Sequence, residues 1–239
     1  MDCSGPRLAL VVAAAGYGAR LGSEVPKQYV PLLGIPMLQR TLAALSTCDR
    51  VDALAVVVNP QDVDYCREEI RMESIEKVVR VVAGGEERAM SVRNGLWALS
   101  VIGTWDFVGV HDGARPLVTC QEIGRAVDSL VNVPTLDGVV LAVRSPDTVK
   151  IVDKAGLITS TPDRRTLWRA QTPQIFRWQV LMDAYAQPDG VLVGATDDSA
   201  LVERLGGKVA VVEGSTENFK ITDRADLRHA EQILAERRR

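Results

Sequence analysis

The sequence predicts an α/β fold: a doubly wound, mostly parallel sheet with helices on both faces. Short apolar runs rich in Val, Ala and Leu recur along the chain with little polar alternation. Such runs are typical of strands buried on both faces. Segments with helical periodicity lie between them, which gives a βαβα order. We expect residues 1–239 to form a single domain, because 239 residues suit one large core.

The individual elements follow from these patterns and from helix start signals such as Thr222-Asp223. Strands are predicted at Leu8–Ala14, Ala53–Val58, Val78–Val82, Phe107–Val110, Gly138–Val143 and Lys208–Val212. Helices are predicted at Met37–Ser46, Asp62–Met72, Arg88–Leu99, Gln121–Val131, Trp178–Tyr185, Ser199–Leu205 and Arg224–Glu236.

One segment, residues 144–171, departs from this alternation. It is polar and rich in turn residues, with a short strand expected at Thr148–Val152 and a hairpin turn at 153–156. It is too polar for the core and too long for an ordinary loop. Since loops of this length usually carry function or contact a partner, we expect a projecting β-arm.

Composition narrows the class of protein. The formal net charge of −3 disfavours a general nucleic-acid binder. No apolar stretch reaches the roughly 18 residues of a membrane span, and the run from Leu8 to Ala15 resembles a strand more than a signal peptide. The four cysteines lie far apart without a C-x-x-C pair, so we expect thiols in a reducing, cytoplasmic compartment with no metal or redox role.

Candidate functional residues follow the predicted strands, where open parallel sheets bind ligands. After the first strand, Ala14, Ala15, Gly16 and Gly18 would let backbone N–H groups approach a phosphate. Arg20 and Lys27 would add positive charge to the same phosphates. A simple tight turn is the alternative. The Walker P-loop and the dinucleotide fingerprint do not fit, because Gly-Lys-Ser/Thr is absent and Leu21 stands where a small residue is needed.

Three further segments of the chain extend this candidate site. Gly84, Gly85 and Glu86, with Ser91 in the next helix, follow the third strand, although a glycine turn before a helix is the alternative. Asp112 ends the fourth strand and could hold Mg²⁺ together with substrate phosphates, or pair with Arg115. Lys220 precedes the last helix and would add a cation, unless it is simply solvated.

Several longer motifs occur in a fixed order along the chain, and together they resemble those of a known family. They run from Ala-Ala-Gly-Tyr-Gly-x-Arg-Leu and Pro-Lys-Gln-Tyr through Gly-Gly-Glu-Glu-Arg-x-x-Ser-Val and His-Asp-Gly-Ala-Arg-Pro to Leu-Trp-Arg-Ala-Gln-Thr-Pro-Gln, Thr-Asp-Asp-Ser and Asn-Phe-Lys-Ile-Thr. Over nearly its whole length the chain resembles the 2-C-methyl-D-erythritol 4-phosphate cytidylyltransferases of the non-mevalonate isoprenoid pathway. The resemblance implies a Rossmann-like nucleotidyltransferase fold and a homodimer with exchanged arms.

The resemblance also implies the reaction: the acceptor phosphate attacks the α-phosphorus of CTP, with a divalent metal such as Mg²⁺ at Asp112. It implies catalytic roles for Arg20, Lys27, Arg164 and Lys220. Nucleotide contacts are implied for Ala14, Ala15, Gly16, Gly18, Gly84, Gly85, Glu86, Ser91 and Asp112, and acceptor contacts for Thr148, Arg164, Thr172, Thr196 and Lys220.

Two alternatives stay open at this point. A ribitol 5-phosphate cytidylyltransferase would share the fold and CTP, but Ala-Ala-Gly in the first loop and Thr-Asp-Asp-Ser favour methylerythritol phosphate. A non-catalytic nucleotide-sensing module on the same fold is the second alternative. The joint presence of Arg20, Lys27, Asp112 and Lys220 argues against it. Expected partners are therefore CTP and a small polyol phosphate.

Overall fold

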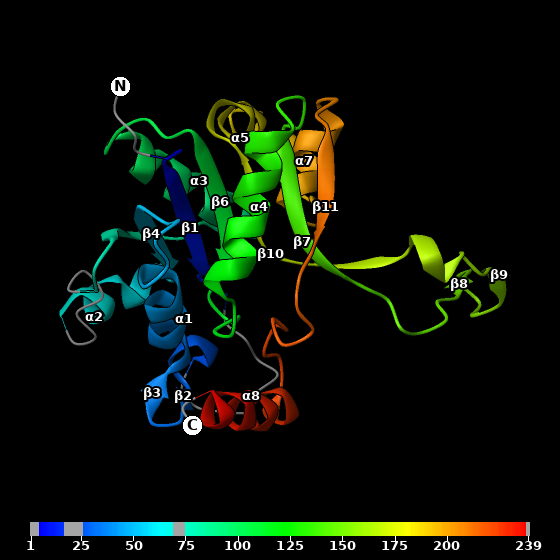
Figure 1. Cartoon of the computed structure of the whole chain (residues 1–239), viewed down its shortest axis with the longest axis horizontal. Helices are drawn as coiled ribbons and strands as arrows, with labels where there is room; N and C mark the ends of the chain where they lie inside the picture. Colours follow the sequence, from blue (N-terminus) through cyan, green and yellow to red (C-terminus); the bar gives the residue numbers. More distant parts are fainter. Residues whose placement is uncertain (1–4, 17–25, 69–74, 238–239) are drawn as a thin grey trace.

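A computed structural model of the protein describes residues 5–16, 26–68 and 75–237. Within these residues the chain forms a central seven-stranded sheet with the strand order β11-β7-β10-β6-β1-β4-β5 (Figure 1). The strands are β1 (Leu8–Ala14), β4 (Ala53–Val58), β5 (Val78–Ala83), β6 (Phe107–Asp112), β7 (Gly138–Arg144), β10 (Trp168–Arg177) and β11 (Val209–Glu213). The six strands predicted outside residues 144–171 are all present, and the α/β prediction is confirmed. The strand expected at Thr148–Val152 is shorter in the structure and spans Ile151–Val152.

Strand β10 is the central strand that the sequence reading missed. It runs antiparallel to both β6 and β7, whereas the other neighbouring pairs are parallel. Its sequence, WRAQTPQIFR, hides the strand because Pro173 interrupts a polar run. The register with β7 shifts between Ala170 and Gln174, so the proline sits at an irregularity of the ladder. The first residues of β10, assigned to the arm from sequence, pair with the end of β7.

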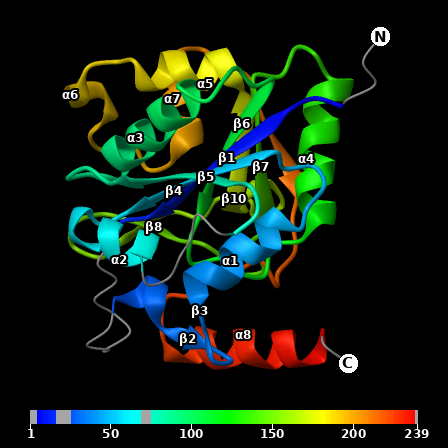
Figure 2. The same ribbon diagram turned by 90° about the vertical axis from the view of Figure 1, so that its left-hand side faces the viewer.

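Strand β1 shows why continuous apolar runs predicted a sheet buried on both faces. Leu8, Leu10 and Val12 belong to the core on one face, while Ala9 and Val11 belong to the core on the other. Helices α1 (Met37–Ser46), α2 (Val63–Glu68) and α4 (Cys120–Asn132) contribute to the first core, and α3 (Arg88–Ser100), α5 (Trp178–Tyr185) and α7 (Asp198–Arg204) to the second. Figure 2 shows α3, α5 and α7 on one side of the sheet and α1 and α4 on the other.

The predicted helices agree closely with the structure. The predicted bounds of α1 and α5 hold without change, as do those of α8 (Arg224–Glu236). The described part of α2 ends at Glu68, and the predicted continuation to Met72 falls outside the described residues. The short elements η2 (Lys27–Tyr29), η3 (Pro60–Asp62), η5 (Arg164–Thr166) and α6 (Asp189–Leu192) were not predicted. No helix in residues 5–16, 26–68 and 75–237 has the length and apolar character to cross a membrane.

A third apolar cluster lies below the carboxyl ends of the strands. There α8 packs on a small hairpin of β2 (Pro31–Leu32) and β3 (Ile35–Pro36), as Figure 2 shows. The cluster includes Leu32, Met37, Leu117, Ile221, Ala230 and Ile233. Because it joins the two chain segments that carry Lys27 and Lys220, this cluster fixes both lysine-bearing segments to the carboxyl edge of the sheet.

The segment between β7 and β10 extends away from the sheet (Figure 1). It carries a two-stranded hairpin of β8 (Ile151–Val152) and β9 (Ile158–Ser160). The predicted turn is present: Asp153 N–H donates to the Leu157 carbonyl at 3.0 Å, and Gly156 adopts a φ of 84° that favours glycine. We call residues 145–167 the arm from here on.

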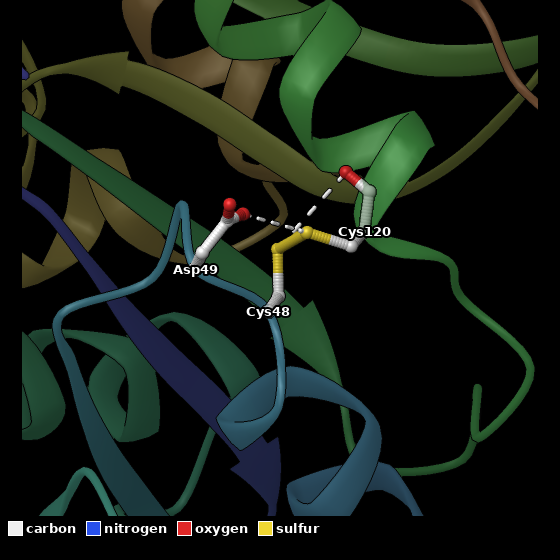
Figure 3. A group of neighbouring side chains, drawn as sticks. All are labelled: Cys48, Asp49 and Cys120. Carbon is white, nitrogen blue, oxygen red and sulfur yellow. Dashed lines mark hydrogen bonds between the residues drawn. A yellow bond between two sulfur atoms is a disulfide. The ribbon is translucent and has the colours of Figure 1, made fainter.

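The prediction of four separate thiols is wrong for Cys48 and Cys120, which form a disulfide (Figure 3). They are 72 residues apart in sequence, and no local spacing could indicate the pairing. They meet because Cys48 follows the end of α1 while Cys120 begins α4, and both helices cover the same face of the sheet. Cys66, in contrast, is a buried free thiol.

Candidate active site

A cavity of about 700 Å³ opens at the carboxyl edge of the sheet, where the sequence placed the candidate site. Its walls come from the residues that follow β1, β4, β5 and β6, from η2, and from the segment before α8. Ten predicted site residues line it: Ala14, Ala15, Gly16, Lys27, Gly84, Gly85, Glu86, Ser91, Asp112 and Lys220. These separate motifs therefore line one cavity, while the roles predicted for their residues stay predictions.

The wall formed by Gly84 and Gly85 explains why glycines stand there. A Cβ on Gly84 would lie 2.5 Å from the Ala15 Cβ and 2.8 Å from the Ser91 Oγ. Gly84 N–H also donates to the Val58 carbonyl at 2.7 Å, which ties the ends of β4 and β5 together. Ser91 Oγ accepts from Gly85 N–H at 3.1 Å and so fixes the turn into α3. Only a residue without a side chain fits this close approach.

Asp112 sits at the centre of the charged part of the cavity. Its Oδ2 lies 3.1 Å from Lys220 Nζ and 3.3 Å from Arg115 Nε, so the pairing with Arg115 considered from sequence is present alongside the lysine contact. Burial opposes ionisation of Asp112, but the charges of Lys220, Arg115 and Arg88 outweigh it and lower its pKa to about 2. Asp112 is therefore a carboxylate at neutral pH.

The carboxylate of Asp112 also suits a divalent cation. The contacts to Arg115 and Lys220 both involve Oδ2. Mg²⁺ typically takes one or two carboxylate oxygens and completes its shell with water and substrate phosphates. A single ionised aspartate at the wall of a cavity of about 700 Å³, which has room for a phosphorylated ligand, fits that donor set.

His111 lies beside Asp112 but is turned into the protein. Thr172 Oγ1 accepts from Asp112 N–H at 3.0 Å and lies 3.1 Å from His111 Nδ1, while His111 Nε2 lies 3.1 Å from the Arg115 carbonyl. Because a carbonyl only accepts, Nε2 carries the proton and Nδ1 accepts from the Thr172 hydroxyl. Complete burial lowers the His111 pKa to about 4. A neutral, doubly hydrogen-bonded imidazole organises the wall and is not available as a base.

Lys27 is held at the rim by the segment around it. Tyr29 Oη donates to Asp62 Oδ2 at 3.2 Å and lies 3.0 Å from Cys66 Sγ, which fixes η2 to η3 and α2. Burial, with the neighbouring Cys66 and Asp62, raises the pKa of Tyr29, so the hydroxyl stays neutral.

On the other side of Lys27, Asp226 accepts from both Thr222 N–H and Thr222 Oγ1–H at 2.6 Å. Burial opposes ionisation of Asp226, yet the Thr222 and Asp223 hydrogen bonds and the charge of Lys27 lower its pKa. The charge of Lys27 therefore acts on Asp226 in the first turn of α8.

Arg88 is a cavity residue to which sequence analysis gave no role. Its two terminal nitrogens contact both oxygens of Asp198 at 2.9 and 2.7 Å, and Tyr185 Oη donates to the same carboxylate at 2.5 Å. Asp198 is fully buried. Burial opposes the charge on Arg88, but Asp198 dominates and raises its pKa. The pair joins the first turn of α3 to the first turn of α7.

Four predicted acceptor contacts lie outside the cavity of this chain. Thr148 and Arg164 belong to the arm and are exposed. Thr196 is exposed just before α7, and Thr172 is buried with its hydroxyl engaged by Asp112 and His111. Of the predicted residues, Gly18 and Arg20 fall in positions 17–25, outside the described residues.

Several cavity residues had no predicted role: Ala13, Gln28, Asn59, Pro60, Glu87, Arg88, Gly113, Ala114 and Thr222. Most lie inside or next to quoted motifs, so a rule that each motif contributes all of its residues would have found them. Asn59 and Pro60 follow β4, and only their position at the carboxyl end of a strand pointed to them.

The fold and the position of the cavity define a class: the open α/β proteins, which bind their ligands at the carboxyl edge of the sheet. The family follows from sequence comparison. A family model described as 2-C-methyl-D-erythritol 4-phosphate cytidylyltransferase matches residues 8–236, and the chain belongs to that family.

Individual relatives agree along the whole length. The 2-C-methyl-D-erythritol 4-phosphate cytidylyltransferase of Geobacter metallireducens is 42% identical over 229 residues, covering 95% of this chain and 97% of the relative. That of Pelotomaculum thermopropionicum is 41% identical, covering 97% and 95%. The crystal structure of the 4-diphosphocytidyl-2C-methyl-D-erythritol synthase of Anaerococcus prevotii superposes with a TM-score of 0.81 at 29% identity, covering 97% of this chain and 100% of that chain.

Proposed function

We propose that this enzyme transfers CMP from CTP to 2-C-methyl-D-erythritol 4-phosphate and releases pyrophosphate. The observation that carries the proposal is the convergence of Lys27, Lys220 and Asp112 on one glycine-walled cavity in a member of this family. These residues come from three distant parts of the chain. A polyanionic nucleotide and a phosphate acceptor need such a concentration of cations, which stands out in a chain with a net charge of −3.

The chemistry assigned to the cavity requires no nucleophilic side chain. An oxygen of the acceptor phosphate forms a bond to the α-phosphorus of CTP, and the bond from that phosphorus to the bridging oxygen of pyrophosphate breaks. The acceptor is already ionised near neutral pH, so no base is needed, in agreement with the engaged imidazole of His111. The protein therefore acts by holding two polyanions in line and by stabilising the charge that develops between them.

Individual residues take the following roles in this proposal. The backbone from Ala14 to Gly16, with Gly18, binds the triphosphate, and Gly84, Gly85, Glu86 and Ser91 complete the base and ribose pocket. Lys27 and Arg20 stabilise the α-phosphate as it is attacked. Asp112 would hold Mg²⁺ or another divalent cation, which when bound neutralises phosphate charge. Lys220 binds the acceptor from the cavity wall, and Thr148 and Arg164 would reach it from the arm of a second chain. Thr172 and Thr196 lie outside the cavity, and the Thr172 hydroxyl is taken up by Asp112 N–H and His111, so Thr172 acts by positioning that wall.

The same proposal includes a homodimer in which arms are exchanged. The arm of one chain carries Thr148 and Arg164 away from its own cavity, and its apolar side chains are exposed, for example Leu157 at 67% and Ile158 at 62%. A second copy of the chain would cover these side chains and bring Arg164 to the partner's cavity. We place the enzyme in the cytoplasm, where CTP is available.

A pyrophosphate-release assay tests the activity. With Mg²⁺ present, CTP and methylerythritol phosphate should give rapid release, and ribitol 5-phosphate should give much less. Replacing CTP by UTP should also cost a large factor, because an oxygen acceptor replaces the N4 amine donor and leaves a buried partner unpaired. Faster release with ribitol 5-phosphate than with methylerythritol phosphate would favour the ribitol alternative, and no release with either acceptor would favour the sensing module.

A further inference from the structure

The disulfide between Cys48 and Cys120 lies outside the proposed chemistry and joins the segment that follows α1 to the first residue of α4 (Figure 3). Cys48 is fully buried just after α1. Cys120 is half-buried at the first residue of α4. The two sulfurs therefore differ in access: a small molecule in solution can reach Cys120 but not Cys48.

The charges around the pair also differ for the two sulfurs. Asp49 Oδ1 lies 3.3 Å from Cys120 Sγ, and Figure 3 shows the Asp49 carboxylate pointing toward that sulfur. Lys77 Nζ donates to the Cys48 carbonyl at 2.8 Å. The first turn of α4 favours a thiolate at Cys120, whereas the Asp49 carboxylate disfavours it. In the reduced protein, the Cys120 thiol could donate a hydrogen bond to Asp49. Asp49 is thus placed to slow the reaction of Cys120.

The position of the pair connects it to the cavity wall. Thr41 Oγ1 in α1 donates to the Gly113 carbonyl at 2.9 Å, and the disulfide links the end of α1 to the start of α4. The loop of residues 113–119 lies between these two attachments. Gly113 and Ala114 in this loop line the cavity, and Arg115 pairs with Asp112. When the cysteines are oxidised, residues 113–119 are therefore attached at both ends to α1 or the segment after it: by the Thr41 hydrogen bond at Gly113 and by the disulfide at Cys120.

We propose that Cys48 and Cys120 form a reversible thiol–disulfide site, oxidised by low-molecular-weight disulfides, that fastens α1 to α4 next to the cavity. In a reducing compartment such pairs are usually transient and redox-sensing. The Cys120 thiolate attacks one sulfur of the external disulfide, forms a mixed disulfide and releases one thiolate. The Cys48 thiolate then attacks the Cys120 sulfur and releases the second thiolate. The two cysteine thiols lose two protons and two electrons, and the external disulfide becomes two thiols.

The first test reads each cysteine separately in the full-length wild-type protein. The protein is equilibrated with mixtures of reduced and oxidised glutathione, free thiols are alkylated, and peptides are quantified by mass spectrometry. Cys48 and Cys120 should become protected together as the oxidised form increases, and both should return on reduction, while Cys66 serves as the internal comparison. In Cys120→Ser, Cys48 should stay a thiol throughout. Unprotected Cys48 and Cys120 at every ratio, or protection that reduction does not reverse, would overturn the proposal.

A second test addresses Asp49 and the fastening. Asp49→Asn should shorten the half-time of oxidation by roughly 3–10-fold, since it removes a charge that opposes the thiolate. Asp128→Asn is the matched control, because it removes an exposed carboxylate from α4, the helix that begins at Cys120. This variant should oxidise at the wild-type rate. Equal rates for both variants would remove Asp49 from the site.

Oxidation of the wild type should raise Tm by roughly 5–15 °C, because the bond closes a long loop in the unfolded chain. The same treatment should leave the Tm of Cys120→Ser unchanged. If the disulfide forms but Tm does not rise, the proposal that it stabilises the attachment of α1 to α4 is wrong. None of these readouts depends on the transferase activity, so they stand apart from the test of the proposed function.

Discussion

The cavity edge and the arm are both rich in charged residues, but the protein holds them in opposite ways. Asp112 is 8% exposed and contacts Lys220 and Arg115, which come from other parts of the chain. On the arm, the Asp163–Arg165 pair lies within one turn, and both residues are exposed. The cavity edge is thus organised by contacts between distant segments, whereas the arm contacts mainly itself and its own base. The described cavity edge is therefore shaped by contacts within one chain, and the proposed exchange of arms would give the arm its contacts from a second chain.

The largest expected effect is on the cavity side of this comparison. Lys27→Ala should lower the turnover number by about 10²–10³, the usual loss when one preorganised partner of a transition state is removed. Stability should change little, because the Tyr29–Asp62 contact that anchors η2 remains. Steady-state kinetics with CTP and methylerythritol phosphate measure this. Lys208→Ala, an exposed lysine away from the cavity, should behave like the wild type. A turnover within a factor of a few of the wild type would remove Lys27 from the mechanism.

Complementation tests the arm side. Arg164→Ala alone and Lys27→Ala alone should both stay near background, but a mixture should recover activity. In a mixed dimer, one site combines the body of the Arg164→Ala chain with the arm of the Lys27→Ala chain and is intact. Random exchange of equal amounts makes about half of the dimers mixed, so roughly a quarter of the wild-type activity should return. If differently tagged subunits prove that exchange occurred and activity stays absent, Arg164 works within its own chain.

The same contrast explains what the sequence could and could not reveal. Strand β1 and the cavity walls were predictable because a uniform apolar run and a glycine-rich turn are local signals. Strand β10 was not, because its buried Gln171, Thr172 and Gln174 look like a loop until their hydrogen-bond partners are known. The Cys48–Cys120 disulfide and the Arg88–Asp198 ion pair could not be predicted for a related reason. Each joins residues that are distant in sequence and that only the tertiary fold brings together.

Acid should lower the free energy of unfolding because His111, which lies beside Asp112 of the cavity wall, is buried in its neutral form. Its pKa of about 4 in the folded protein lies below the ordinary 6.5, so the unfolded chain binds the proton more tightly. This contribution is complete above about pH 6.5 and is lost as the pH falls towards 4, by up to about 3 kcal/mol. Asp112 adds a loss below its ordinary 3.8, towards its folded pKa of about 2.

Urea unfolding at a series of pH values between 4 and 7 measures this dependence. The free energy of unfolding of His111→Gln should vary less with pH in that range than that of the wild type. His229→Gln, which changes the histidine that stacks on Phe219, should keep the wild-type slope. A wild-type slope in His111→Gln would show that another group causes the acid sensitivity.

The smallest expected effect concerns the Arg88–Asp198 pair, which joins two walls of the cavity side. Asp198→Asn keeps the shape and a hydrogen-bond acceptor for Tyr185 but removes the charge that faces Arg88. Removing one partner of a fully buried pair can cost 3–5 kcal/mol, but the Arg88 side chain is 37% exposed, so water compensates in part. We expect a loss of about 1–2 kcal/mol in the free energy of unfolding, measured with urea.

Asp128→Asn, which breaks the exposed pair with Arg50, should cost less than about 0.5 kcal/mol. Kinetics separate positioning from stability: if the pair aligns α3 with α7, Asp198→Asn raises KM for the acceptor more than KM for CTP. An equal rise in both constants would mean that the pair stabilises the fold without aligning the two walls.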